Sequence, residues 1–329
     1  MAKAVRVPAL VAALLAVWAA LVARPAMSQA REPHWPDSLV LGTASPGGTY
    51  YDYGDGLARI LTRALGIPVL ARATEGPSQN ILLLESGEIQ LAFVTQGVAL
   101  QAWNGAPWTG GRPLRVMRAM FPMYDTPFQF VTLQDSGVQA VADLSGKRVG
   151  VGPQGGTAGA YVPQFLKVLK AEASLVHGDW ADLAAQLAER RIDALAVAAG
   201  VPFPALGDIE RKAKVRYLPL GQQQILDLRL AMPELGASTV AAGSYPSLRR
   251  HYPTVGLYNF AVAHRDLPDD LVYAIVEAVF ANHEQLVEVH PAAAETIPAN
   301  FTRNAFMPFH GGAGRWYHTR GVMGVAGGD

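Results

Sequence analysis

Four loops rich in Gly, Ser and Thr carry the residues in this sequence that are best suited to chemistry. They are GTASPGGTYY at residues 42–51, TEGPSQN at 74–80, VTQG at 94–97 and GVGPQGG at 150–156. In α/β proteins such loops join the carboxyl end of a strand to the start of a helix, where backbone N–H groups can receive an anion. Any one of them could be a plain turn, but their repetition predicts a ligand-binding cleft.

Two of these loops imitate nucleotide-binding motifs. The first has the spacing of a phosphate loop, but Gly48 occupies the position of the lysine that would hold the β- and γ-phosphates, so nucleotide hydrolysis is not expected. Gly150, Gly152 and Gly155 match a dinucleotide fingerprint, although Pro153 stiffens that turn. A single match of this kind is a weak signal, and we expect no cofactor.

No catalytic or metal-binding set stands out elsewhere. The chain contains no Cys, which excludes thiol nucleophiles, disulfides and thiolate zinc sites. His283 and His290 flank Glu284 and Glu288, but a metal there would need a further ligand, whereas a solvated helix face needs none. Neither G-x-S-x-G nor H-E-x-x-H occurs. We therefore expect a protein that is not an enzyme and holds no metal.

Alternating strand and helix patterns position these loops, as in α/β proteins. Period-two apolar runs predict strands at residues 38–44, 67–73, 89–95, 114–121, 147–152, 193–199 and 255–264, with a crossing strand at 128–133. Helical spacing of apolar residues predicts helices at residues 51–65, about 78–85, 158–170 and 180–190, and one long or two broken helices over 267–290. The pattern restarts near residue 147, which predicts two α/β units with a cleft between them.

The amino terminus has the features of a secretory signal peptide over residues 1–30. Lys3 and Arg6 precede an apolar run from Val7 to Ala23, and Ser28-Gln29-Ala30 has the small residues that a signal peptidase reads. A membrane anchor is the alternative, because the run approaches the roughly 20 residues that span a bilayer. We expect cleavage after Ala30 and a periplasmic product.

The charge balance excludes one class of partner. Three of the 27 basic residues and none of the 27 acidic residues lie in the predicted signal peptide, which leaves a net charge of 24 − 27 = −3. That balance gives no basic footprint for nucleic acid.

Taken together, these segments resemble the TAXI family of TRAP-transporter solute receptors over nearly the full length. The resemblance is carried by GTASPGGTYYDYGDGLARIL, TEGPSQNILLLESGEIQLAFV, LSGKRVGVGPQGGT, RRIDALAVAAGVPFPAL, DLPDDLVYAIVEAVF and MPFHGGAGRWYHTRG. It implies a type II periplasmic-binding-protein fold, in which crossing strands join two α/β lobes around a ligand cleft. It further implies capture of a small organic acid or amino acid by hinged closure and delivery to an ion-gradient-driven TRAP permease. We expect a monomer.

The resemblance also assigns domains and site residues. Lobe I would begin with residues 31–126, lobe II would comprise 127–254 with a crossing strand, and 255–329 would return a strand and helices to lobe I. The implied ligand-binding residues are Thr43, Ser45, Gly48, Thr49, Tyr50, Asn80, Thr95, Gln96, Gln154, Gly155, Gly156, Thr157 and Pro202, with Gly200 beside the last.

Three departures from the family pattern bear on the ligand. The family commonly has Ser at the positions of Pro77 and Gly156 and an acidic residue at that of Gly97, so three side-chain partners are missing. The four loops contain no Lys or Arg, but helix starts near Thr49, Ser78 and Ala158 could hold one carboxylate. We expect a monocarboxylate with a less polar tail. An exported sensor for a membrane histidine kinase and an exported hydrolase are the alternative functions.

Overall fold

The computed structural model describes residues 32–323. The predicted signal peptide and its cleavage position after Ala30 lie outside the described residues. Across residues 32–323, no helix combines the length and the apolar character needed to cross a membrane.

The first α/β unit, called lobe I here, is built on three parallel strands. These are β1 (Leu39–Gly42), β2 (Val69–Arg72) and β3 (Leu91–Thr95), in the order β2-β1-β3. Helices α2 (Thr49–Leu65) and α3 (Pro77–Glu85) connect them. Helix α2 ends where Gly66 adopts φ 68°, a left-handed conformation that glycine takes without a Cβ clash.

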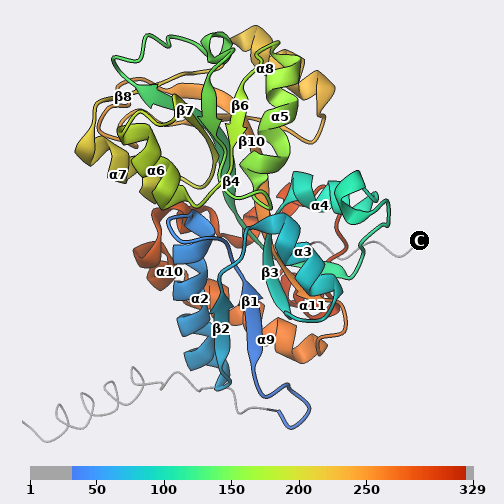
Figure 1. Cartoon of the computed structure of the whole chain (residues 1–329). Coiled ribbons are helices and arrows are strands. Elements are labelled where there is room, and N and C mark those ends of the chain that lie inside the picture. The colour runs from blue at the N-terminus through green and yellow to red at the C-terminus, as the bar shows by residue number, and fades with distance from the viewer. Residues whose placement is uncertain (1–31, 324–329) are drawn as a thin grey trace, which may run out of the picture.

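Lobe II repeats this plan with three more parallel strands. Strands β5 (Arg148–Gly150), β6 (Ser174–Val176) and β7 (Ala194–Ala198) alternate with helices α5 (Thr157–Val168) and α6 (Trp180–Ala188). Helix α7 (Pro204–Lys212), strand β8 (Val215–Tyr217), helix α8 (Gln222–Ala231) and strand β9 (Gly236–Val240) complete the lobe seen at the top of Figure 1.

Two long antiparallel strands run from one lobe into the other. Strand β10 (Tyr252–His264) pairs with β9 in lobe II and with β3 in lobe I, and β4 (Met117–Leu133) pairs with β10 and with β7. The expected lobe boundaries after residues 126 and 254 therefore fall inside these crossing strands. Strands were predicted at 114–121 and 128–133 as two separate elements. This separation is wrong, because one continuous strand, β4, runs through both. Pro122 lies at a bulge in the pairing with β10, and Pro127 precedes Phe128, where the pairing of β4 with β7 begins.

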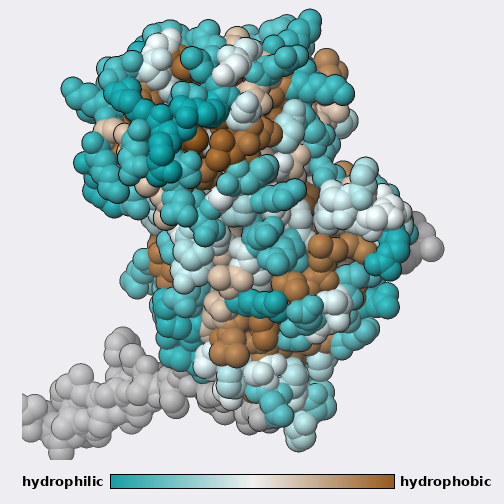
Figure 2. Space-filling model, viewed as in Figure 1, coloured by the Kyte–Doolittle hydropathy of each residue, from teal (hydrophilic) through white to brown (hydrophobic). Residues whose placement is uncertain are grey.

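The rest of the chain packs on lobe I. Helices α9 (Asp269–Ala281) and α10 (His283–Val289) replace the predicted helical stretch 267–290 and meet at Asn282, and α11 (Gly311–Thr319) packs against α9. The strand-to-helix turn predicted at 94–97 is the direct junction of β3 with helix α4 (Gln96–Trp103), with no loop residue between them. The apolar core of lobe I lies on both faces of its sheet, under α2 and α9 on one side and under α3 and α4 on the other. Figure 2 shows the two lobes in contact along one face of the molecule.

Candidate functional site

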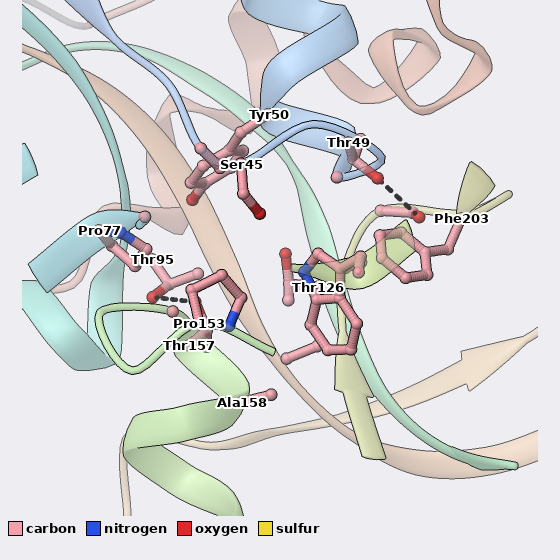
Figure 3. A pocket seen from close by; sticks show the side chains of 18 of the residues that line it. Ser45, Thr49, Tyr50, Pro77, Thr95, Thr126, Pro153, Thr157, Ala158 and Phe203 are labelled. Carbon is pink, nitrogen blue, oxygen red and sulfur yellow. Dashed lines mark hydrogen bonds between the residues drawn. The ribbon is translucent and has the colours of Figure 1, made fainter. Parts of the chain in front are cut away.

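A cavity of about 50 Å³ lies between the lobes, where the loops at the strand ends face one another. From lobe I and the crossing strand β4 it is lined by Ala44, Ser45, Gly48, Thr49, Tyr50, Glu75, Gly76, Pro77, Thr95, Tyr124 and Thr126. From lobe II it is lined by Pro153, Gly156, Thr157, Ala158, Trp180, Ala198, Ala199, Gly200 and Phe203. In Figure 3, Ser45 and Tyr50 lie across the cavity from Pro153, Thr157 and Ala158.

Seven of the thirteen ligand-binding residues expected from sequence are in this lining. They are Ser45, Gly48, Thr49, Tyr50, Thr95, Gly156 and Thr157. The structure places the other six outside it: Thr43, Asn80, Gln96, Gln154, Gly155 and Pro202.

Two helices begin at the cavity wall. Thr49 is the first residue of α2 and Thr157 the first residue of α5, and both follow a glycine in extended conformation. The first turn of a helix leaves N–H groups without intrahelical partners, and the aligned peptide dipoles give that end partial positive charge. The loops therefore present two anion-receptive ends to one small space.

The third expected helix start, near Ser78, does not serve the cavity in the same way. Helix α3 begins with Pro77, which has no N–H, and the Ser78 N–H donates to the Gly155 carbonyl at 3.0 Å. Gly155 in turn donates its own N–H to Glu75 Oε2 at 3.2 Å. The N-terminus of α3 is thus used to fasten the lobes together.

Two further hydrogen bonds join the lobes at the cavity. The Thr49 hydroxyl donates to the Gly200 carbonyl at 3.2 Å, and the hydroxyls of Thr95 and Thr157 are 3.1 Å apart. Both pairs are drawn in Figure 3. With the Ser78–Gly155 contact, they define a closed arrangement of the two lobes.

Two buried hydroxyls in the lining have no hydrogen-bond partner among residues 32–323. They belong to Ser45, which is 5% exposed, and Tyr124, which is 1% exposed. Burial raises the pKa of Tyr124 well above its usual range, so the phenol stays protonated and can donate. Tyr50, by contrast, donates to Asn259 Oδ1 at 2.6 Å. A buried hydroxyl without a partner is costly, and these two point to a polar group supplied by a ligand.

The side chains that line the cavity include one acidic group, no basic group and several apolar rings. Within the described chain, Glu75 is the only charged side chain that lines the cavity, and no Lys or Arg does. Trp180 packs edge-on against Phe203, with ring centroids 5.2 Å apart, and Pro77 and Pro153 add further apolar surface to the lining. The arrangement offers backbone dipoles to an anion and apolar side chains to the rest of a ligand.

The side chains of Asn80, Thr43 and Gln96 were expected to contact the ligand, but they form hydrogen bonds within the protein. Asn80 is fully buried and donates to the carbonyls of Gly42, Thr43 and Phe93, so its amide ties the strand ends of lobe I together. The Thr43 hydroxyl donates to the Arg72 carbonyl at 2.9 Å.

Gln96 is also fully engaged. Its amide donates to the Arg303 carbonyl, and its side-chain oxygen accepts from the Ala305 N–H, so it anchors the C-terminal segment. The partners of Asn80, Thr43 and Gln96 lie at other places in the sequence, so the ligand role implied by the resemblance could not be checked against them before the fold was known.

The lobe II residues outside the lining have other surroundings. Gln154 is exposed, Gly155 makes the interlobe contacts described above, and the Pro202 carbonyl lies 3.1 Å from His290 Nε2. Gly152, at φ 75°, lies so close to the Trp180 ring that a Cβ there would overlap it. The glycines of this loop therefore serve close packing and interlobe contact.

The histidines considered for metal binding are used in hydrogen bonds. His283 Nε2 lies 2.8 Å from the Ala293 carbonyl, and His290 faces Pro202. Over residues 32–323, no cluster of three or more His, Cys, Asp or Glu side chains is arranged to hold a metal ion.

Sequence reasoning missed five lining residues that matter for the chemistry of the cavity. Tyr124 and Thr126 lie on the crossing strand β4, and Trp180 and Phe203 follow the ends of β6 and β7 in lobe II. Glu75 belongs to the loop at 74–80, of which only other residues were considered as ligand contacts. The position of Phe203 just after the strand predicted at 193–199 was an available signal, whereas no strand was predicted before Trp180. Nothing in the sequence indicated which face of β4 would meet the cavity.

The chain is similar to known proteins in both sequence and fold. The model of the NMT1-like family matches residues 41–321. Among solved structures, MatC from Rhodopseudomonas palustris with bound malate is similar with a TM-score of 0.59 and 13% identity, over 83% of this chain and 93% of that one. The periplasmic binding protein BugD gives a TM-score of 0.56 and 14% identity, over 80% and 88% of the two chains.

An ancestral arginine-binding protein bound to arginine is a third similar structure. It gives a TM-score of 0.51 and 16% identity, over 78% of this chain and 98% of that one. At such low identity these likenesses concern the fold, which is that of the type II periplasmic binding proteins.

Proposed function

The chain belongs to the NMT1-like family of periplasmic-type solute-binding proteins, and on that premise we propose that it captures a small monocarboxylate in the interlobe cavity. The observation that carries this proposal is the pairing of two helix starts, at Thr49 and Thr157, with two unpartnered hydroxyls, at Ser45 and Tyr124. Helix N-termini bind carboxylates without a side-chain cation, and a carboxylate oxygen accepts from a hydroxyl.

The remaining lining favours one carboxylate over two. Glu75 would repel a second negative charge, and Pro77 and Gly156 offer it no side-chain donor. A water-sized group needs roughly 10–15 Å³, so a cavity of about 50 Å³ suits a compact acid. We infer a ligand of about two to four carbons with an apolar end against Trp180 and Phe203.

Binding is proposed to coincide with hinged closure around β4 and β10. Residues 31–126 and 255–329 would belong to one lobe and residues 127–254 to the other, and the interlobe hydrogen bonds at Thr49 and Thr95 would form on closing. Small-angle scattering should give a smaller radius of gyration when ligand saturates the protein. An unchanged radius, starting from ligand-free protein, would contradict a closing cleft.

Delivery to a TRAP permease driven by an ion gradient is the second part of the proposal. It rests on the resemblance to the TAXI receptors, while family membership supports the solute-binding role. Uptake by proteoliposomes that contain the cognate permease should require this receptor and an imposed sodium or proton gradient. Uptake that requires ATP instead would refute this assignment.

We further propose export to the periplasm as a monomer. The basic, apolar and small-residue pattern of residues 1–30 supports cleavage after Ala30. Sequencing of the periplasmic product should begin at or near Arg31, and a membrane-bound product that retains Met1 would contradict export by cleavage.

The ligand class is tested by native mass spectrometry followed by calorimetry. The protein as purified is first examined for a retained small acid. Acetate, propionate, pyruvate, lactate and butyrate are then titrated beside malate, glutamate, 2-oxoglutarate and arginine. A clear preference for a dicarboxylate or an amino acid would refute the monocarboxylate proposal.

A further inference from the structure

His290 joins the two lobes behind the cavity lining. It separates α10 from the 3₁₀ helix η3 (Pro291–Glu295), and its side chain is 4% exposed. Nδ1 accepts from the Ala292 N–H at 3.1 Å, and Nε2 lies 3.1 Å from the Pro202 carbonyl of lobe II. Because both the carbonyl and Nδ1 accept, Nε2 must carry the ring proton, and the imidazole is neutral with both nitrogens satisfied.

We propose that His290 is a positioning residue for ligand capture, whose neutral ring holds the closed state and whose protonation releases it. The bond to Pro202 holds the same lobe II segment whose Gly200 lines the cavity and accepts from the Thr49 hydroxyl. Breaking it frees that wall of the site. The inference rests on the proposed closure of the cleft.

Protonation conflicts with the observed geometry at one atom. A proton on Nδ1 would place two N–H groups against each other at Ala292, 3.1 Å apart, and η3 would lose the side chain that caps its start. The ring can relieve this conflict only by rotating, and rotation moves Nε2 away from Pro202.

Burial is the main influence on the titration of this ring. It lowers the pKa of His290, while the bond to Pro202 and the field of the Asp52 carboxylate on α2 oppose that shift. The lobe II segment 199–204 contains no ionisable side chain. On η3, Glu295 accepts from the Asp125 N–H, so it is engaged at the hinge.

Opening of the cleft exposes the His290 ring, so the balance between the open and closed forms depends on pH. In the open form the ring reaches water and its pKa returns toward about 6.5, so the open form binds more protons than the closed form. The contribution to closure is fully present above about pH 6.5 and is lost as the pH falls toward the lowered pKa of the closed form. Between those values, each fall of one pH unit should raise the ratio of open to closed protein by up to about tenfold.

The test measures lobe separation directly and needs no added ligand. The chain has no native Cys, so Leu82→Cys on α3 and Leu230→Cys on α8 introduce a single spin-label pair. Both side chains are exposed, at 44% and 80%. Interlobe distances are recorded by pulsed electron paramagnetic resonance on the protein as purified, from about pH 8 to pH 5.

A matched control exists in lobe I. His310 is also buried, caps the start of α11 through Nδ1 and the Gly312 N–H, and has a pKa lowered mainly by burial, but it touches only lobe I. His290→Gln should abolish the pH-dependent separation, whereas His310→Gln should retain it. Asp52→Asn should lower the pKa of His290 further and move the opening midpoint to a lower pH.

Three results would overturn the proposal. They are a wild-type distance that does not change with pH, a His290→Gln variant that responds like wild type, and an opening midpoint unaffected by Asp52→Asn. Failure of the proposed ligand class would instead appear in the carboxylate titrations, which do not enter this measurement.

Discussion

Replacing Tyr124 with Phe tests whether the cavity is built to receive a ligand's polar group. The substitution removes one oxygen and keeps the ring, which lies against Gly200 and packs on Tyr50 and Tyr53. The hydroxyl is buried and has no partner within residues 32–323, so it contributes nothing to folding that its loss could remove.

Tyr124→Phe should affect the stability of the protein and its affinity for ligand in opposite directions. A buried unpaired hydroxyl costs about 1–3 kcal/mol, so Tyr124→Phe should raise the free energy of unfolding of the ligand-free protein, or leave it unchanged. A hydrogen bond to a charged group contributes about 1.5–3 kcal/mol, so affinity for a carboxylate should fall by about 10- to 150-fold.

Tyr53→Phe is the matched control in the same aromatic cluster. The Tyr53 hydroxyl lies 2.9 Å from Thr296 Oγ1, and its ring centroid lies 5.5 Å from that of Tyr124. Its loss should destabilise the fold by about 1 kcal/mol and leave affinity unchanged, because its hydroxyl bonds within lobe I.

Urea denaturation of ligand-free protein and calorimetric titration of the identified acid measure both quantities. If Tyr124→Phe destabilises the protein while affinity stays the same, the hydroxyl has an internal role and the reasoning is refuted. Equal effects of the two substitutions on affinity would also refute it.

Other substitutions separate structural residues from ligand-contacting ones. Asn80→Ala should lower the free energy of unfolding by about 3 kcal/mol or more, because it leaves buried carbonyls unpaired. Ligand affinity of the folded fraction should not change, and weakened binding at full stability would contradict this. Gly200→Ala should prevent closure, because a Cβ there would lie 2.7 Å from Tyr124 Cε2. Gly207→Ala should not, because its Cβ would meet only Arg211 Nη1, at 3.8 Å, and scattering at saturating ligand distinguishes the two variants. Glu75→Gln should raise affinity for malate relative to lactate in calorimetry, and an unchanged ratio would show that this carboxylate does not select against a second charge.

Local sequence signals located the loops but not their roles. The apolar spacing that predicted a helix from residue 51 reflects the buried face of α2, and Gly66 ends that helix by its own conformational freedom. Such features depend on neighbours within a few residues, so they can be read without the fold. The same holds for the strand-to-helix loops that begin α2 and α5.

The tertiary structure alone decided which polar groups are free to meet a ligand. Asn80 and Tyr124 are both buried, yet the Asn80 amide is consumed by carbonyls from two strands, while the Tyr124 hydroxyl has no partner within the described chain. The N–H of Ser78 was available to a ligand on sequence grounds, but it is used by Gly155, 77 residues away in the other lobe. Whether a donor is free depends on groups that only folding and closure bring within hydrogen-bond distance, and no local pattern encodes that approach.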